Sequence, residues 1–66
     1  MKIVLNGSLK EVVEGIAVEE LIETLELLPE QVAVEVNGGL IVRAERSAFQ
    51  LKEDDVVELV TLVGGG

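Results

Sequence analysis

Residues 56–66 read VVELVTLVGGG, a run of aliphatic residues that ends in three glycines. Alternation along this run predicts a β-strand with Val57 and Leu59 on one face. The opposite face is also aliphatic and carries Val56, Val60 and Leu62. Such a strand is either buried on both sides at the centre of a sheet, or it offers one face to another protein.

Upstream of this strand, two short runs of alternating apolar residues predict β-hairpins. Residues 1–14 form the first, because the favoured turn pair Asn6-Gly7 separates two short apolar runs. Residues 32–42 form the second, with the turn at Asn37-Gly38-Gly39. Residues 43–50 are less regular and predict a crossing segment with one short helical turn and Phe49 tucked under it. The predicted order is therefore β-β-α-β-β-β.

Between the hairpins, residues 18–28 change to a helical period. One stripe of the predicted helix is apolar and consists of Val18, Leu21, Ile22, Leu25 and Leu28. We expect Pro29 to end this helix, and we expect a weak N-cap because Ala17 has no side-chain oxygen. One helix covers only one face of a sheet. We therefore expect a partner to bind the other face of the last strand, at Val60, Leu62 and Glu58.

Composition limits the classes of function. The chain of 66 residues predicts one domain over residues 1–63 and a flexible glycine tail over 64–66. It has no cysteine and no histidine, so thiolate metal ligands and the usual acid–base group are absent. Thirteen acidic residues against five basic ones give a net charge of −8, which repels nucleic acid. Neither a membrane span nor a signal peptide is predicted, so we expect a cytoplasmic protein.

No motif predicts a metal or cofactor site within the chain. Asn37-Gly38-Gly39 is not a phosphate loop, because neither Lys-Ser/Thr nor a helix follows it. The adjacent acids Glu53, Asp54 and Asp55 are expected to form a solvated turn. Arg43 and Arg46 are open to two roles, pairing with acidic residues or contacting a partner.

The element order, the single helix and the Gly-Gly ending resemble the ubiquitin-like β-grasp proteins. That resemblance implies an α+β fold in which a mixed sheet of four to five strands packs one helix on one face. Within that group the whole chain is similar to the ThiS family, the sulfur carriers of thiamine biosynthesis. The matching stretches are IVLNG at 3–7, VEELIETL at 18–25, VAVEVNGGLIVR at 32–43 and EDDVVELVTLVGGG at 53–66. The chain departs from the family at Ala17, where a hydroxyl residue is usual, and at Asp54-Asp55, where Gly-Asp is frequent.

The resemblance implies a carrier and not an enzyme. A ThiF-like adenylyltransferase would use ATP and Mg²⁺ to adenylate the carboxylate of Gly66. Sulfur from a cysteine desulfurase would convert it to a thiocarboxylate, which would donate sulfur to the thiazole synthase ThiG. Gly64 and Gly65, which lack side chains, would thread the active sites of these partners. The carrier itself would hold no cofactor.

Three alternatives share these sequence features. The small subunit of molybdopterin synthase has the same fold and the same thiocarboxylate chemistry, although its chains are usually longer and richer in aromatic residues. A ubiquitin-like modifier would join the same terminal glycine to lysines of target proteins. A plain β-grasp interaction module would make no use of the glycines.

Overall fold

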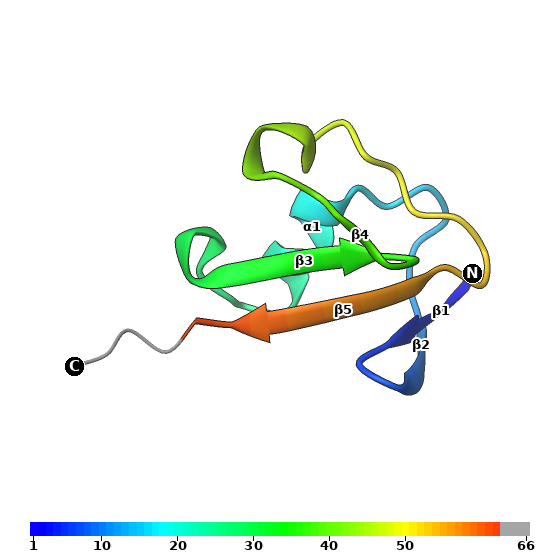
Figure 1. Ribbon diagram of the computed structural model, residues 1–66. Helices are drawn as coiled ribbons and strands as arrows, with labels where there is room; N and C mark the ends of the chain where they lie inside the picture. The colour runs from blue at the N-terminus through cyan, green and yellow to red at the C-terminus, as the bar shows by residue number, and fades with distance from the viewer. Residues whose placement is uncertain (63–66) are drawn as a thin grey trace.

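The computed structural model describes residues 1–62, so the predicted tail at Gly64–Gly66 lies outside the described residues. Five strands form one mixed sheet in the order β2-β1-β5-β3-β4 (Figure 1). The central strand β5 pairs in parallel with β1 and antiparallel with β3. The strands are β1 (Lys2–Leu5), β2 (Ser8–Glu11), β3 (Val32–Val36), β4 (Gly39–Leu40) and β5 (Val56–Thr61).

Both predicted hairpins are confirmed, and each turns at an Asn-Gly pair. Asn6 and Gly7 have φ values of 48° and 83°, and Asn37 and Gly38 have 52° and 85°. Positive φ at both central residues is what a two-residue type I′ turn requires. The strands are shorter than predicted, because β2 ends at Glu11 and β4 ends at Leu40. Ile41, which follows β4, still donates its N–H to the carbonyl of Val34 in β3 at 2.9 Å, and it is buried in the core.

The helix α1 (Val18–Thr24) is also shorter than predicted, and Pro29 does not end it. Glu26 has a left-handed backbone with φ of 58°. The Glu26 N–H donates to the carbonyl of Glu23 at 2.9 Å, and the Leu27 N–H donates to that of Ile22 at 3.1 Å. This pair of bonds is the Schellman arrangement, which satisfies the last carbonyls of the helix. Leu28 therefore lies beyond the helix and is exposed, and Pro29 begins a short 3₁₀ helix, η1 (Pro29–Gln31).

The start of α1 depends on the crossing segment for its hydrogen bonds. Ala17 makes no side-chain cap bond, as predicted. Instead, the carbonyl of Phe49 accepts the Val18 N–H at 2.9 Å, and the carbonyl of Arg46 accepts the Glu19 N–H at 3.1 Å. These bonds satisfy helix N–H groups that have no partner inside the helix. The crossing segment contains the predicted helical turn, η2 (Arg43–Glu45).

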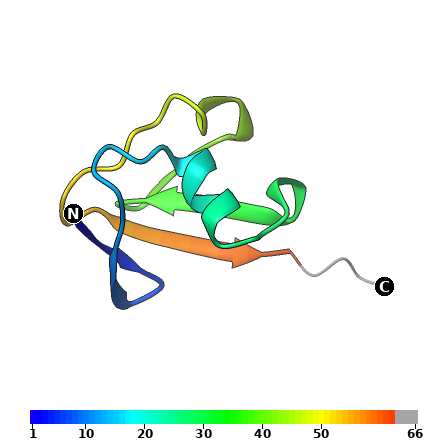
Figure 2. The same ribbon diagram turned by 180° about the vertical axis from the view of Figure 1, so that it is seen from behind.

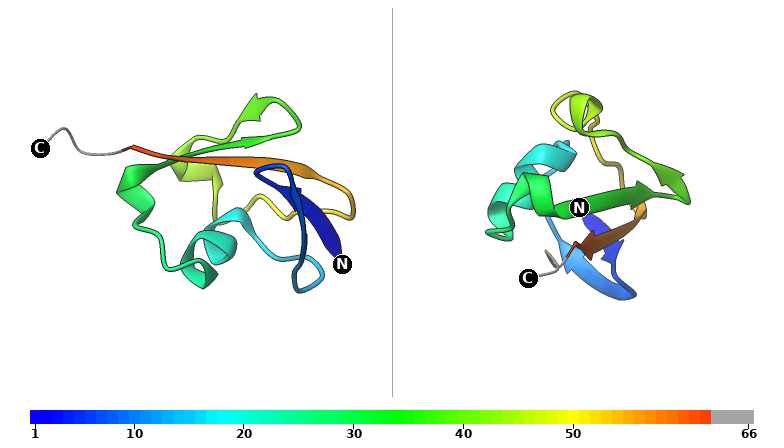
Figure 3. Two further views of the ribbon diagram at one scale, coloured as in Figure 1. Left: turned by 90° about the horizontal axis from the view of Figure 1, so that it is seen from below. Right: turned by 60° about the vertical axis from the view of Figure 1, so that its left-hand side comes forward.

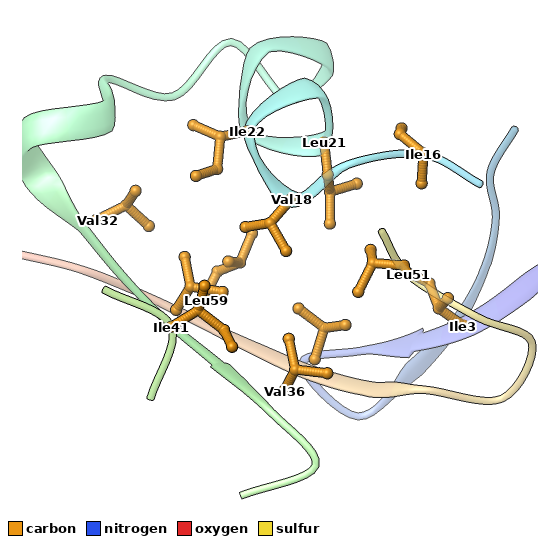
Figure 4. Close-up of a cluster of buried hydrophobic side chains, with 12 residues drawn as sticks. Ile3, Ile16, Val18, Leu21, Ile22, Val32, Val36, Ile41, Leu51 and Leu59 are labelled. Atoms are coloured by element: carbon orange, nitrogen blue, oxygen red, sulfur yellow. The ribbon is translucent and has the colours of Figure 1, made fainter. Parts of the chain in front are cut away.

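The hydrophobic core lies on one side of the sheet. Figures 1 and 2 view the sheet from opposite directions, and Figure 3 shows α1 to one side of β3 and β5. Val18, Leu21 and Ile22 of α1 are fully buried and point toward the sheet (Figure 4). Val34 and Val57 are fully buried beneath them, and Phe49 packs partly buried at the margin. The predicted α+β class with one helix on one face is confirmed.

Candidate functional site

The central strand β5 is buried on one face and exposed on the other. Val57 and Leu59 lie in the core, whereas Val60 and Leu62 keep 58% and 55% of their surface exposed. The predicted assignment of residues to the two faces of this strand is confirmed. The sequence left two alternatives for this strand, a central strand buried on both faces or a strand with one exposed face. In the structure β5 lies at the centre of the sheet, between β1 and β3, and one of its faces is nevertheless exposed.

The pairing register extends this exposed surface across the sheet. Residues directly opposite each other on paired strands point to the same side. Val4 lies opposite both Val56 and Leu9, and Ala33 lies opposite Val60. We define the open face as the outward-pointing residues of the sheet and the residue that follows β5, namely Lys2, Val4, Leu9, Glu11, Ala33, Glu35, Leu40, Val56, Glu58, Val60 and Leu62.

Much of the open face is apolar and in contact with solvent. Among the large hydrophobic residues exposed within residues 1–62, Leu9, Leu40, Val56, Val60 and Leu62 all belong to it. Leu9, on the edge strand, keeps 72% of its surface exposed. Exposed apolar residues gathered on one face are characteristic of a protein-binding surface, whereas single ones are ordinary. The open face is therefore the candidate functional site of the described residues.

Two glutamates lie next to each other near the middle of this face. Glu35 of β3 is directly opposite Glu58 of β5, and Glu35 is also opposite Leu40 of β4. Like charges in direct cross-strand positions destabilise a sheet. Glu58 was predicted to belong to this surface, and Glu35 was not. Alternation in VAVEV places Glu35 outward, but only the register reveals its neighbour.

Side chains of the two Asn-Gly turns hold β5 in place. The Leu59 N–H donates to Oδ1 of Asn6 at 2.8 Å, and the Val56 N–H donates to Oδ1 of Asn37 at 2.9 Å. Nδ2 of Asn37 in turn donates to Oδ1 of Asp55 at 3.0 Å. Both amides therefore fix the strand that carries most of the open face.

The acidic turn before β5 has a structural role. Oδ2 of Asp55 accepts the Lys52 N–H at 2.8 Å, and Oε1 of Glu53 accepts the Lys2 N–H at 3.1 Å. Within residues 1–62, no three histidine, cysteine or acidic side chains are grouped so that they could hold a metal ion. No helix in this part of the chain is long and apolar enough to span a membrane.

Arg46 fixes the far end of β5, which the sequence did not indicate. The Leu62 N–H donates to the carbonyl of Gln31 at 2.6 Å. On either side of Gln31, the guanidinium of Arg46 donates to the carbonyls of Pro29 at 2.9 Å and Val32 at 2.6 Å. Arg46 is 6% exposed, so it belongs to the interior and not to the open face. The two roles left open for this residue were pairing with an acid and contacting a partner, and its hydrogen bonds to backbone carbonyls are a third. Arg43 is exposed.

Comparison with known proteins identifies relatives along the whole chain. The profile of the ThiS family matches residues 3–66. A protein named thiazole synthase from Magnetococcus marinus is 42% identical over all 66 residues, although this chain spans only 20% of its length. An uncharacterised protein, ycf40, from Porphyra purpurea is 29% identical, and the match covers 93% of it.

Solved structures agree in fold and in sequence. The crystal structure of the thiamine biosynthesis protein ThiS from Geobacter metallireducens superposes with a TM-score of 0.86 at 35% identity, and both chains are covered completely. A solution structure of a thiamine biosynthesis protein from the same organism gives 0.84, also at 35% identity, and 88% of that chain is covered. This chain, with its α+β ubiquitin-like β-grasp fold, belongs to the ThiS family.

Proposed function

We propose that this protein is a sulfur carrier in the thiazole branch of thiamine biosynthesis, with the carboxylate of Gly66 as its sulfur-bearing group. The observation that carries the proposal is the ThiS family match, which runs from residue 3 through Gly66 itself. The likeness of the whole chain to ThiS of Geobacter metallireducens supports it. The protein would act as a carrier on which partner enzymes work.

The chemistry explains why partner enzymes are needed. A free carboxylate is a poor acyl donor, so an oxygen of the Gly66 carboxylate first attacks ATP on a ThiF-like adenylyltransferase that binds Mg²⁺. Pyrophosphate leaves, and the carboxylate becomes a mixed anhydride with AMP. The terminal sulfur of a persulfide on the cysteine desulfurase then attacks the carbonyl carbon and displaces AMP, which gives an acyl disulfide. A thiol reductant cleaves the sulfur–sulfur bond of this disulfide and releases the thiocarboxylate. The chain has no cysteine, so it could not carry this sulfur on a thiol side chain.

The residues before Gly66 suit this role. Gly64 and Gly65 have no side chains, so this segment fits a narrow channel into an active site. A segment without side chains carries little information for recognition. We therefore assign selectivity to the folded surface, with Val60, Leu62 and Glu58 of the open face as partner contacts.

One comparison favours thiazole synthesis over molybdopterin synthesis. The Magnetococcus protein that contains a region similar to this chain is named thiazole synthase. Because one protein bears both that name and a carrier-like region, we propose that this carrier delivers its sulfur to thiazole synthase. The thiocarboxylated protein should then support formation of thiazole phosphate by thiazole synthase, and should yield no molybdopterin with the large subunit of molybdopterin synthase.

The first prediction concerns Gly66. With adenylyltransferase, ATP, Mg²⁺, cysteine, cysteine desulfurase and a thiol reductant, the intact mass should rise by the difference between one sulfur and one oxygen atom. Deleting Gly66, or adding one alanine after it, should abolish this rise while circular dichroism is unchanged.

Gly39→Ala is the matched control, because a Cβ at Gly39 meets only the carbonyl oxygen of Val36 at 3.6 Å, an ordinary contact. This variant should accept sulfur as the wild type does. Sulfur acceptance by the protein that lacks Gly66 would contradict the proposed function.

A further inference from the structure

The open face combines an apolar surface with a pair of like charges. Glu35 and Glu58 occupy opposing positions on the adjacent strands β3 and β5. Apolar residues lie two positions away on both sides along β5, at Val56 and Val60. Within residues 1–62 neither glutamate makes a hydrogen bond through its side chain, whereas Glu20, Glu53 and Asp55 all accept backbone N–H groups. Repulsion between the two carboxylates destabilises the free protein, and no hydrogen bond of their side chains within residues 1–62 offsets it.

The position of Leu62 restricts what must cover this face. Gly66 follows Leu62 by four positions. Four residues span at most about 14 Å even when fully extended. If Gly66 is the reacting group, an enzyme that acts on it must therefore contact the protein close to Leu62. The open face reaches Leu62 and supplies apolar residues there.

The charge of the face argues against a second copy of the chain as its occupant. Two copies that met face to face would bring together four carboxylates from Glu35 and Glu58. Each copy also carries a net charge of −8. Burying like charges without compensation is strongly unfavourable. A partner with a basic side chain in an apolar surround would complement the face instead.

We propose that thiazole synthase docks on the open face and places one basic side chain, an arginine, between Glu35 and Glu58. This inference rests on the proposed function and identifies the contact that selects the partner. Arginine suits the position because its planar guanidinium donates to two carboxylates at once and sheds water more readily than an ammonium group. The surrounding apolar residues would exclude water from the contact and strengthen it.

The test compares isosteric variants that each remove one negative charge. Glu35→Gln, Glu58→Gln and the double variant would be titrated with purified thiazole synthase by calorimetry, without activating the tail. Each single change should weaken binding by about tenfold or more, because it removes one partner of a desolvated charge contact. The same changes should raise the thermal midpoint of the free protein slightly, because they relieve the cross-strand repulsion. A merely structural role would move binding and stability in the same direction.

Glu23→Gln is the matched control, because it makes the same change in net charge at an exposed position on α1. It should alter affinity far less than either open-face variant. Binding of the wild type should also weaken with added salt, and more steeply than that of the double variant.

Two further outcomes would contradict the inference. Binding of Glu35→Gln and Glu58→Gln as tight as that of Glu23→Gln would overturn the arginine contact and leave the proposed carrier function intact. Sedimentation could instead show that the wild type forms a dimer which Leu9→Asp on the open face disrupts, which would make a second copy the occupant. Failure of the proposed function is seen separately, as absence of sulfur on Gly66 in the mass measurement.

Discussion

At the scale of single residues, Glu26 has an unfavourable backbone conformation at the end of α1. Its φ of 58° lies in the left-handed region that favours glycine or asparagine. The same conformation occurs at Asn6 and Asn37, where the residue type tolerates it. Glu26 therefore stores strain that the Schellman bonds offset.

Replacing Glu26 should relieve this strain. Glu26→Gly is expected to increase the free energy of unfolding by about 0.5–1 kcal/mol, since glycine adopts positive φ without steric cost. The measurement is thermal or urea unfolding followed by circular dichroism. Glu23→Gly is the control, because position 23 lies inside α1, and there glycine should destabilise by about 1 kcal/mol. A loss of stability on Glu26→Gly would show that the side chain of Glu26 matters more than its backbone strain.

The two Asn-Gly turns were predictable from the local sequence, but the hydrogen bonds of their side chains were not. Asn-Gly pairs predict type I′ turns from local sterics alone, and both turns at Asn6 and Asn37 are where they were predicted. The bonds from their side chains to β5 were not predictable. They join residues far apart in the sequence, such as Asn6 and Leu59. Only the pairing of strands in the sheet brings such residues together, and the local turn sequence does not indicate it.

At the scale of elements, α1 and the end of β5 depend on one irregular segment. The carbonyl of Arg46 accepts an N–H from the start of α1, and its guanidinium holds the carbonyls of Pro29 and Val32. Gln31, between those two residues, accepts the Leu62 N–H. Arg46 thus connects the start of the helix to the strand end from which the tail continues.

Removing the guanidinium should therefore loosen both elements. Arg46→Met keeps the apolar stem but leaves two buried carbonyls without donors, and we expect it to lower the free energy of unfolding by about 2–4 kcal/mol. Arg46→Lys should recover part of this loss, because an ammonium group can satisfy one carbonyl. Hydrogen exchange at the Leu62 amide should be faster in Arg46→Met than in the wild type.

Arg43→Met serves as the control for charge, because Arg43 is exposed. It should change stability by no more than about 0.5 kcal/mol. Equal effects of the two substitutions would mean that Arg46 acts through net charge and not through its hydrogen bonds.

Element boundaries were less predictable than element types. The apolar stripe of residues 18–28 predicted a helix, but α1 ends at Thr24. The apolar periodicity continues past the Schellman turn, and the left-handed residue of this turn is a glutamate and not the usual glycine. Nothing in the local sequence therefore indicated that the helix ends there. The structural role of Arg46 could not be predicted either, because the sequence does not distinguish a buried arginine that binds carbonyls from an exposed one.

At the scale of the whole molecule, one helix and one sheet leave a single face uncovered. Alternation in VVELV separated the core face from the exposed face, and the structure agrees at Val57, Leu59 and Val60. The sequence could not show that Glu35 and Glu58 are neighbours, because strand register depends on contacts across the sheet. Residues Gly64–Gly66 lie outside the described part of the chain, so their role stays a prediction.

A charge introduced on the exposed face of the sheet should have a different effect from one introduced on its buried face. Leu62 is exposed and Leu59 is buried, because residues three positions apart along an extended chain point to opposite faces. Leu62→Asp should leave the free energy of unfolding within about 0.5 kcal/mol of the wild type, since no core contact is lost. Leu59→Asp should destabilise the domain by several kcal/mol or unfold it, because it buries an unpaired charge.

The affinity of the ThiF-like adenylyltransferase for these variants should show whether the open face is its contact surface. Any enzyme that acts on Gly66 must come close to Leu62, so Leu62→Asp should weaken this binding while circular dichroism remains that of the folded protein. Leu28→Asp is the control, because Leu28 is equally exposed at 55% but does not belong to the open face. If Leu28→Asp weakens binding and Leu62→Asp does not, the enzyme docks beside η1, and the open face is not its contact surface.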